Sequence, residues 1–227
     1  MTARRPMRVG IIGAGVMAEA MIAGLLANRA VTPGRLAASH PRRERRDALA
    51  ERHGINAVAA NRDTLADAEI VVLAVKPQML TRVMRELRGR LAAEQVVLSI
   101  VAGATLRTLV DGLQHAAVVR AMPNTPSQIR RGITVWSPSE ACTARQRDLA
   151  RAALRSLGEE REVADESFVA MATATTASTL TSSFSTSTTS SITASFTTTS
   201  SVSKIWAPFT LPAFCTFFSS TSNYVRV

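Results

Sequence analysis

Short apolar runs alternate with stretches of helical periodicity over most of the chain. Runs this short and continuous are typical of strands that are buried on both faces of a parallel sheet. The pattern predicts strands at residues 7–12, 36–38, 70–75, 96–100 and 118–121, and helices at 16–26, 64–68 and 105–113. This alternation predicts an α/β fold, a Rossmann-like doubly wound parallel sheet, whose ligands lie beyond the carboxyl ends of the strands.

The composition changes sharply near residue 174. Residues 175–201 are almost entirely Thr and Ser, and no Asp, Glu or Gly follows Glu166. Thr and Ser are poor in helix interiors, and the tract has few apolar side chains whose burial could offset the loss of chain entropy. We therefore predict a Rossmann-like domain at residues 1–165 and an irregular or disordered Ser/Thr-rich tail at 166–227.

The first predicted strand leads into a glycine turn that opens a helix, Gly13-Ala14-Gly15-Val16-Met17-Ala18. Gly13 permits the tight turn, Gly15 has no Cβ to keep a pyrophosphate away, and Ala18 lets helix and strand pack closely. The start of the helix offers unpaired N–H groups and the positive end of its dipole to phosphates. The turn therefore predicts a dinucleotide site.

The residues after the second predicted strand indicate which nicotinamide cofactor fits. NAD sites usually carry an acid there for the ribose 2′-hydroxyl, whereas NADP sites carry neutral or cationic groups. Here the chain reads Ser39-His40-Pro41-Arg42-Arg43, with no acid and with two guanidinium groups that could grip a 2′-phosphate. We predict NADP; the alternative is that both arginines only solvate the start of a helix.

The net charge of +10 raises the question of a nucleic-acid partner. The basic residues are nearly all Arg, are mixed with acids and lack interleaved aromatics, so we expect none. Cys142 and Cys215 form no CxxC pair and have no metal-ligand spacing near them, so we expect no metal site. No signal-peptide pattern is seen, and the apolar stretch 205–218 is short and broken by prolines. We expect a cytoplasmic protein without a membrane span.

Three more loops follow predicted strands and carry unusual residues. They are AVKPQ at 74–78, AGAT at 102–105 and RAMPNTP at 120–126. Their prolines fix φ and remove N–H donors, which favours rigid loops. Lys76 is the only lysine before Lys204, which indicates a position where a guanidinium would not serve. All three loops should face the cofactor.

Together these loops resemble those of pyrroline-5-carboxylate reductase. The matching stretches are VGIIGAGVMAEAMIAGL, EIVVLAVKPQ, SIVAGATL and VVRAMPNTP, in the order and at the spacing of that family. The resemblance extends over about residues 7–174. It implies hydride transfer from NADPH to the C=N carbon of 1-pyrroline-5-carboxylate, a small imine, giving L-proline in proline biosynthesis.

The resemblance also implies where the cofactor lies. Residues 12–18 would hold the pyrophosphate, Asn61 the adenosine side, residues 75–78 the nicotinamide ribose, and residues 122–124 the nicotinamide. No catalytic residue is assigned, because a protonated imine is already electrophilic and needs mainly orientation. With the residues that the loops themselves indicate, the predicted cofactor site comprises Ile12, Gly13, Ala14, Gly15, Val16, Met17, Ala18, Ser39, Arg42, Arg43, Asn61, Val75, Lys76, Pro77, Gln78, Ala102, Gly103, Met122, Pro123 and Asn124.

The chain departs from the family after Ala174. The resemblance implies that a motif like LSGSGPAY and an all-helical domain should follow, which bind the substrate carboxylate and form a homodimer. The Thr/Ser tract stands there instead. Reading Thr and Ser codons one nucleotide earlier gives a pattern like the first helix of that domain. We therefore interpret the tract as the product of a frameshift; the alternative is a genuine Ser/Thr-rich linker.

Three functions fit these observations. The first is pyrroline-5-carboxylate reductase by ancestry, impaired in this form. The second is a non-catalytic NADP-binding module that lacks its substrate domain. The third is another NADP oxidoreductase of similar fold, such as an imine reductase or an F420-dependent enzyme, against which the MPNTP loop argues.

The double variant Arg42→Ala/Arg43→Ala tests the cofactor prediction. It should weaken NADPH binding by about 1–3 kcal/mol, the range for charge-assisted hydrogen bonds, and leave NADH binding nearly unchanged. Calorimetric titration with each cofactor measures both values. Equal losses for the two cofactors would show that the arginines act on the fold or on general charge.

Overall fold

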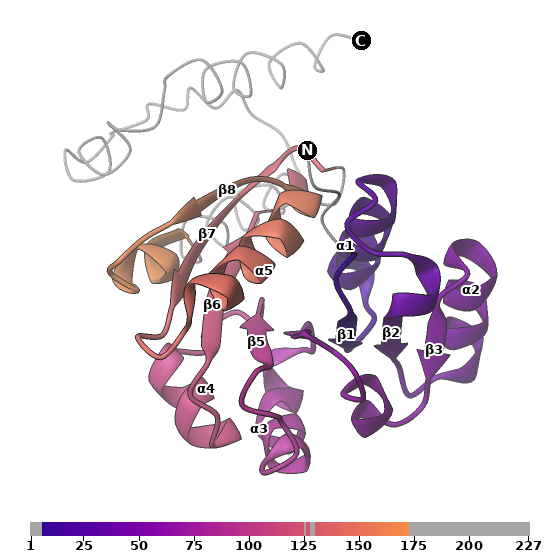
Figure 1. Ribbon diagram of the computed structural model, residues 1–227, viewed down its shortest axis with the longest axis horizontal. Coiled ribbons are helices and arrows are strands. Elements are labelled where there is room, and N and C mark those ends of the chain that lie inside the picture. Colours follow the sequence, from indigo (N-terminus) through magenta and orange to yellow (C-terminus); the bar gives the residue numbers. More distant parts are fainter. Residues whose placement is uncertain (1–5, 125, 128–129, 173–227) are drawn as a thin grey trace, which may run out of the picture. The chain divides into compact units, whose positions relative to one another are not determined.

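A single mixed sheet organises the domain. The structure, a computed structural model, describes residues 6–124, 126–127 and 130–172. Within these ranges eight strands lie in the order β3-β2-β1-β4-β5-β6-β7-β8 (Figure 1). The strands are β1 (Val9–Ile12), β2 (Leu36–Ser39), β3 (Asn56–Val58), β4 (Ile70–Leu73), β5 (Val96–Ser99), β6 (Val118–Pro123), β7 (Gly132–Pro138) and β8 (Gly158–Glu162).

The strand directions are those of a Rossmann fold with two added strands. Neighbours among β1 to β6 are all parallel, and their order is that of a Rossmann sheet. β7 runs antiparallel to β6, and β8 runs parallel to β7. The predicted fold class is therefore confirmed, with a reversed pair of strands at one edge.

Helices cover both faces of the sheet (Figure 1). α1 and α5 contribute to one apolar cluster, and α3 and α4 to the other. The described α-helices are α1 (Val16–Ala27), α2 (Arg43–His53), α3 (Pro77–Leu87), α4 (Leu106–Leu113) and α5 (Ala144–Leu154), with 3-10 turns η1 (Pro33–Arg35), η2 (Asn61–Thr64) and η4 (Arg155–Leu157).

The apolar runs are continuous because both faces of the sheet are covered. In β4, Ile70 and Val72 join the cluster under α1 and α5, whereas Val71 and Leu73 join the cluster under α3 and α4. All four side chains are buried. Successive side chains of a strand point to opposite faces, so a doubly covered strand needs apolar residues at every position. Each such burial stabilises the fold by about 1.5–3 kcal/mol.

The predicted helix at residues 64–68 is wrong. η2 ends at Thr64, residues 65–67 form a turn, and Asp67 has a φ of 60°, which no right-handed helix allows. The segment is pressed against β1, since a Cβ on Gly10 would lie 2.2 Å from the Thr64 carbonyl oxygen. β3, β7 and β8 were not predicted. β3 is three residues long, and β8 reads GEERE, so neither contains an apolar run.

Only the start of the predicted tail is described. A helical segment begins at Ser167, and Val169 within it is buried. Residues 173–227 lie outside the described residues, so the Ser/Thr-rich tail and its origin remain predictions. In the part of the chain that the structure describes, no helix is both long enough and apolar enough to cross a membrane.

A glycine-to-alanine pair tests how closely the helix layer packs. A Cβ on Gly24 of α1 would lie 2.1 Å from the Ser156 carbonyl oxygen, whereas one on Gly34 would meet nothing within 4 Å. Gly24→Ala should lower the free energy of unfolding by about 1–3 kcal/mol through overpacking. Gly34→Ala should change it by less than about 0.5 kcal/mol. Urea unfolding measures both, and equal effects would contradict the contact.

Candidate cofactor site

The glycine turn passes directly over the start of the neighbouring loop. Gly13 has a φ of 89°, and a Cβ there would lie 2.6 Å from Val75 Cγ1 and 2.9 Å from the Ala74 carbonyl oxygen. The N–H groups of Gly13 and Ala14 both donate to the Ser39 carbonyl, at 3.2 and 3.0 Å. The turn is therefore held between the ends of β2 and β4, where only glycine fits.

The start of α1 is open to a ligand. Gly15 is the N-cap residue, no side chain caps the helix, and a Cβ on Gly15 would meet nothing within 4 Å. Val16, the first helical residue, is exposed. A helix start without a side-chain cap presents N–H groups and a positive dipole end, which suit a phosphate.

Four of the predicted loops meet at one apolar cavity. The cavity has a volume of about 240 Å³ and lies at the carboxyl ends of β1, β4, β5 and β6. Six of its lining residues belong to the predicted cofactor site, and the other three flank them in sequence. The lining residues are Met17, Ala74, Val75, Pro77, Ile100, Val101, Ala102, Met122 and Pro123.

The remaining predicted residues of these loops lie outside the cavity lining. Lys76 is the N-cap residue of α3 and is exposed, as are Gln78 and Gly103. Asn124 has a structural role in its own loop, since its Oδ1 accepts hydrogen bonds from the Ile133 N–H at 3.0 Å and the Ser127 hydroxyl at 3.3 Å. A direct contact of these four residues with a cofactor remains a prediction.

The predicted adenosine side is polar and partly paired. The Ser39 hydroxyl donates to Asn61 Oδ1 at 2.7 Å, and Asn61 Nδ2 donates to Glu86 at 2.9 Å. The Arg42 and Arg43 side chains are exposed, and Arg43 approaches Asp47 of its own helix at 3.5 Å. An exposed pair of this kind is worth little. Both guanidinium groups are therefore available to an anion.

His40 lies beside these arginines. Partial burial and the nearby positive charges of Arg42, Arg45 and Arg46 lower the pKa of His40, against a hydrogen bond from the Arg42 N–H. The imidazole Nδ1 accepts that bond at 3.2 Å. His40 is therefore a neutral group at the predicted 2′-phosphate position at neutral pH.

Arg45 is a functional candidate that the sequence did not single out. Its Nε donates to the Ala14 carbonyl at 3.1 Å, and its Nη2 donates to Glu19 at 2.6 Å. Glu19 also accepts from Arg52, at 2.6 Å. Partial burial raises the pKa of Glu19, but hydrogen bonds from Arg45, His53 and Arg52 outweigh it, so the net pKa is lowered. Arg45 thus joins α2 to the back of the glycine turn.

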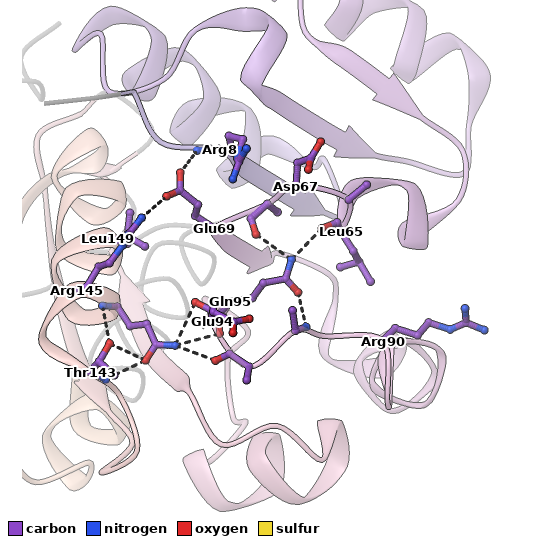
Figure 2. Close-up of a pocket in the computed structure, with 15 residues that line it drawn as sticks. Arg8, Leu65, Asp67, Glu69, Arg90, Glu94, Gln95, Thr143, Arg145 and Leu149 are labelled. Atoms are coloured by element: carbon purple, nitrogen blue, oxygen red, sulfur yellow. Dashed lines mark hydrogen bonds and ion pairs between the residues drawn. The ribbon is translucent and has the colours of Figure 1, made fainter.

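A second cavity, of about 730 Å³, lies at the amino ends of the strands, opposite the first cavity (Figure 2). Arg8, Glu69 and Gln95 line it, each directly before a strand. Glu69 accepts from the Arg8 N–H at 3.0 Å and from Arg145 at 2.7 Å, and these bonds lower its pKa although partial burial raises it. Gln95 Nε2 donates to two carbonyls of the facing loop, at 2.9 Å each.

Many of the polar groups that line this second cavity hydrogen-bond to one another. Gln146 of α5 also lines the cavity and donates to the carbonyls of residues 93–95. Among the described residues, Arg8 Nε is one of two buried side-chain nitrogen or oxygen atoms that have no hydrogen-bond partner. Ligands of open α/β sheets bind at the carboxyl edge, and this cavity is at the amino edge. The candidate cofactor site is therefore the smaller, apolar cavity.

The strand order, the glycine turn and the loops at the carboxyl edge define a Rossmann-type domain of the kind that binds a nicotinamide dinucleotide. A family described as NADP oxidoreductase coenzyme F420-dependent matches residues 8–103. The pyrroline-5-carboxylate reductase of Synechocystis sp. is 36% identical over 156 residues, which are 69% of this chain and 58% of the relative. That of Pseudomonas aeruginosa is 37% identical over 172 residues, 75% of this chain and 63% of the relative.

Solved structures agree. The pyrroline-5-carboxylate reductase of Coxiella burnetii shares 32% identity with a TM-score of 0.70, covering 73% of this chain and 62% of that one. A Plasmodium falciparum pyrroline carboxylate reductase with NADP bound has a TM-score of 0.68 at 19% identity, covering 80% of this chain and 66% of that one. Over this part of its length the chain is similar to pyrroline-5-carboxylate reductases, at 30–37% identity to the curated relatives named so. The chain spans about 60% of the length of the curated relatives it matches.

Two alanine variants of the glycine turn separate folding from binding. Gly15→Ala places its Cβ in open space, so the free energy of unfolding should fall by no more than about 1 kcal/mol. The same methyl group should keep a pyrophosphate from the backbone and weaken NADPH binding about tenfold or more. Gly13→Ala should instead destabilise the fold, because φ is 89° and the Cβ meets Val75.

Unfolding in urea and NADPH titration of both variants measure the two effects. Unchanged NADPH affinity in Gly15→Ala would contradict the placement of the pyrophosphate.

Proposed function

We propose that the domain binds NADPH and derives from an NADPH-dependent 1-pyrroline-5-carboxylate reductase. The observation that carries this proposal is the meeting of the glycine turn with three further loops at one cavity, at the edge where such folds bind ligands. The curated relatives that carry the name pyrroline-5-carboxylate reductase support it. The match covers 58% and 63% of the length of these two relatives.

The choice of NADPH over NADH follows from the end of β2. Ser39 closes that strand, and no acid stands among the next four residues to hold a 2′-hydroxyl. The exposed guanidinium groups of Arg42 and Arg43 would carry the 2′-phosphate, with charge-assisted hydrogen bonds. The Plasmodium relative, which has NADP bound, is consistent with this choice.

The chemistry that fits the cavity is hydride transfer. Bound NADPH would supply the hydride, and the chain's own part is to orient the nicotinamide and exclude water. All nine side chains of the cavity lining are apolar, so none of them can donate or accept a proton. The reaction would therefore rely on an imine that is already protonated, held in a near-attack position.

Holding the imine is the weak point of this chain. The resemblance implies that a segment after Ala174 binds the substrate carboxylate, and the Thr/Ser tract replaces that segment. Loss of positioning can cost about a hundredfold or more in rate. We therefore propose that the protein with this sequence binds NADPH and reduces pyrroline-5-carboxylate only slowly. A non-catalytic NADP-binding module is the second candidate, favoured by the same replacement.

Turnover and binding, measured on the same preparation, test this proposal. Calorimetry should show saturable binding of NADPH, and oxidation of NADPH with pyrroline-5-carboxylate should be about a hundredfold or more slower than in a chain whose reading frame is restored after Ala174. Turnover of the printed chain at about 1 per second or faster would contradict the proposed loss. Absence of NADPH binding would contradict the proposed cofactor.

A further inference from the structure

A partly buried ion pair joins β6, whose end lines the cavity, to the segment that follows the sheet. Arg120 lies in β6 with its side chain 5% exposed, and its Nη1 is 2.5 Å from Glu166 Oε1. The same carboxylate oxygen accepts the N–H of Leu106 at 2.7 Å. Leu106 is the first residue of α4, so Glu166 closes the start of that helix.

The loop before α4 forms part of the cavity wall, and the bond from Leu106 to Glu166 lies directly after it. Val101 and Ala102 line the cavity, and the loop that contains them ends at Thr105, the N-cap of α4. Thr105 accepts the N–H of Thr108 at 3.1 Å, which caps the helix within its own turn. The bond from Leu106 to Glu166 is the long-range one, over 60 residues, and it ties the end of the loop to another segment.

Glu166 also directly precedes the helical segment that begins at Ser167. Its carbonyl accepts the N–H groups of Val169 and Ala170, at 3.0 and 3.2 Å. Asp165 Oδ1 accepts the Ser167 N–H at 2.8 Å, and this bond lowers the pKa of Asp165. Val169 is buried, so the segment is held on the domain by an apolar side chain as well as by charge.

The positions of Arg120 and Glu166 both favour a charged pair. A guanidinium as buried as that of Arg120 is costly without a partner, and a carboxylate at a helix start is favourable. A neutral side chain could fill the same space, so packing alone does not explain an ion pair there. One oxygen that serves both Arg120 and Leu106 fixes the distance between β6 and the start of α4, on either side of the cavity loop.

We infer that Arg120 and Glu166 are positioning residues, which hold the loop 101–105 in place as one wall of the cofactor cavity. The pair transmits this position to the segment that begins at Ser167. This inference rests on the proposed function only for the identity of the ligand. It assigns no contact with the cofactor to either side chain.

Hydrogen exchange of the full chain without cofactor tests the inference first. In Glu166→Gln the amides of residues 101–106 should exchange about tenfold or more faster, because the negative charge that strengthens the bonds to Leu106 and Arg120 is lost, while those of β1 and α1 stay unchanged. Glu162→Gln is the matched control, since Glu162 pairs with Arg147 and Arg151, is 27% exposed against 28% for Glu166, and lies in β8. It should leave exchange at 101–106 unchanged.

Cofactor titration of the same variants adds the functional reading. Glu166→Gln should weaken NADPH binding about tenfold and change binding of 2′-phospho-ADP-ribose, which lacks the nicotinamide, by less than about twofold. Equal losses for both ligands would overturn the inference and leave the pair a stabilising role only. If the parent chain binds neither ligand, the proposed cofactor is wrong, and hydrogen exchange still decides the role of the pair.

The double variant Arg120→Met/Glu166→Gln guards against simple misfolding. Removing both charges leaves no unpaired buried ion, so global stability should be closer to that of the parent chain than in Arg120→Met alone. The backbone amides of residues 101–106 should nevertheless exchange as fast as they do in Glu166→Gln. Recovery of their protection together with stability would overturn the inference.

Discussion

The close approach of the turn after β1 to the end of β4 is the constraint on which the rest of the site depends. Gly13 can pass over Ala74 and Val75 only because it has no Cβ and adopts a φ of 89°. That approach directs α1 away from the sheet edge, with its start uncapped beside the apolar cavity. A side chain at Gly13 would clash with Ala74 and Val75 and push the glycine turn away from the cavity wall.

The loops at the amino ends of the strands and those at the carboxyl ends use their polar groups in opposite ways. At the amino ends of the strands, the side chains of Glu69, Gln95 and Gln146 hydrogen-bond to backbone groups of the surrounding loops. At the carboxyl edge the cavity lining is apolar and the helix start is open. The larger volume therefore belongs to the structural edge, and the smaller one to the candidate site.

The sequence predicted those parts of the fold and site that local patterns encode. The glycine turn, the buried strands β4 to β6 and the loops after them follow from residues close together in the chain. Arg45 could not be chosen from the run of arginines at 42–46, because only the direction of α2 brings one of them to the Ala14 carbonyl. The pairing of Glu166 with Arg120 could not be predicted, because 46 residues separate the two in the sequence. The helix predicted at 64–68 failed because contact with Gly10 outweighed the local pattern.

Chemical-shift mapping of the backbone amides during an NADPH titration tests the central claim most directly. The account predicts saturable shifts in residues 13–18, in the loops after β4 and β5, and at Met122, which all border the carboxyl-edge site. Amides of Arg8, Glu69 and Gln95, at the opposite edge, should stay unchanged. Shifts confined to that opposite edge, or no saturable shift at residues 13–18, would contradict the assignment of the cofactor site.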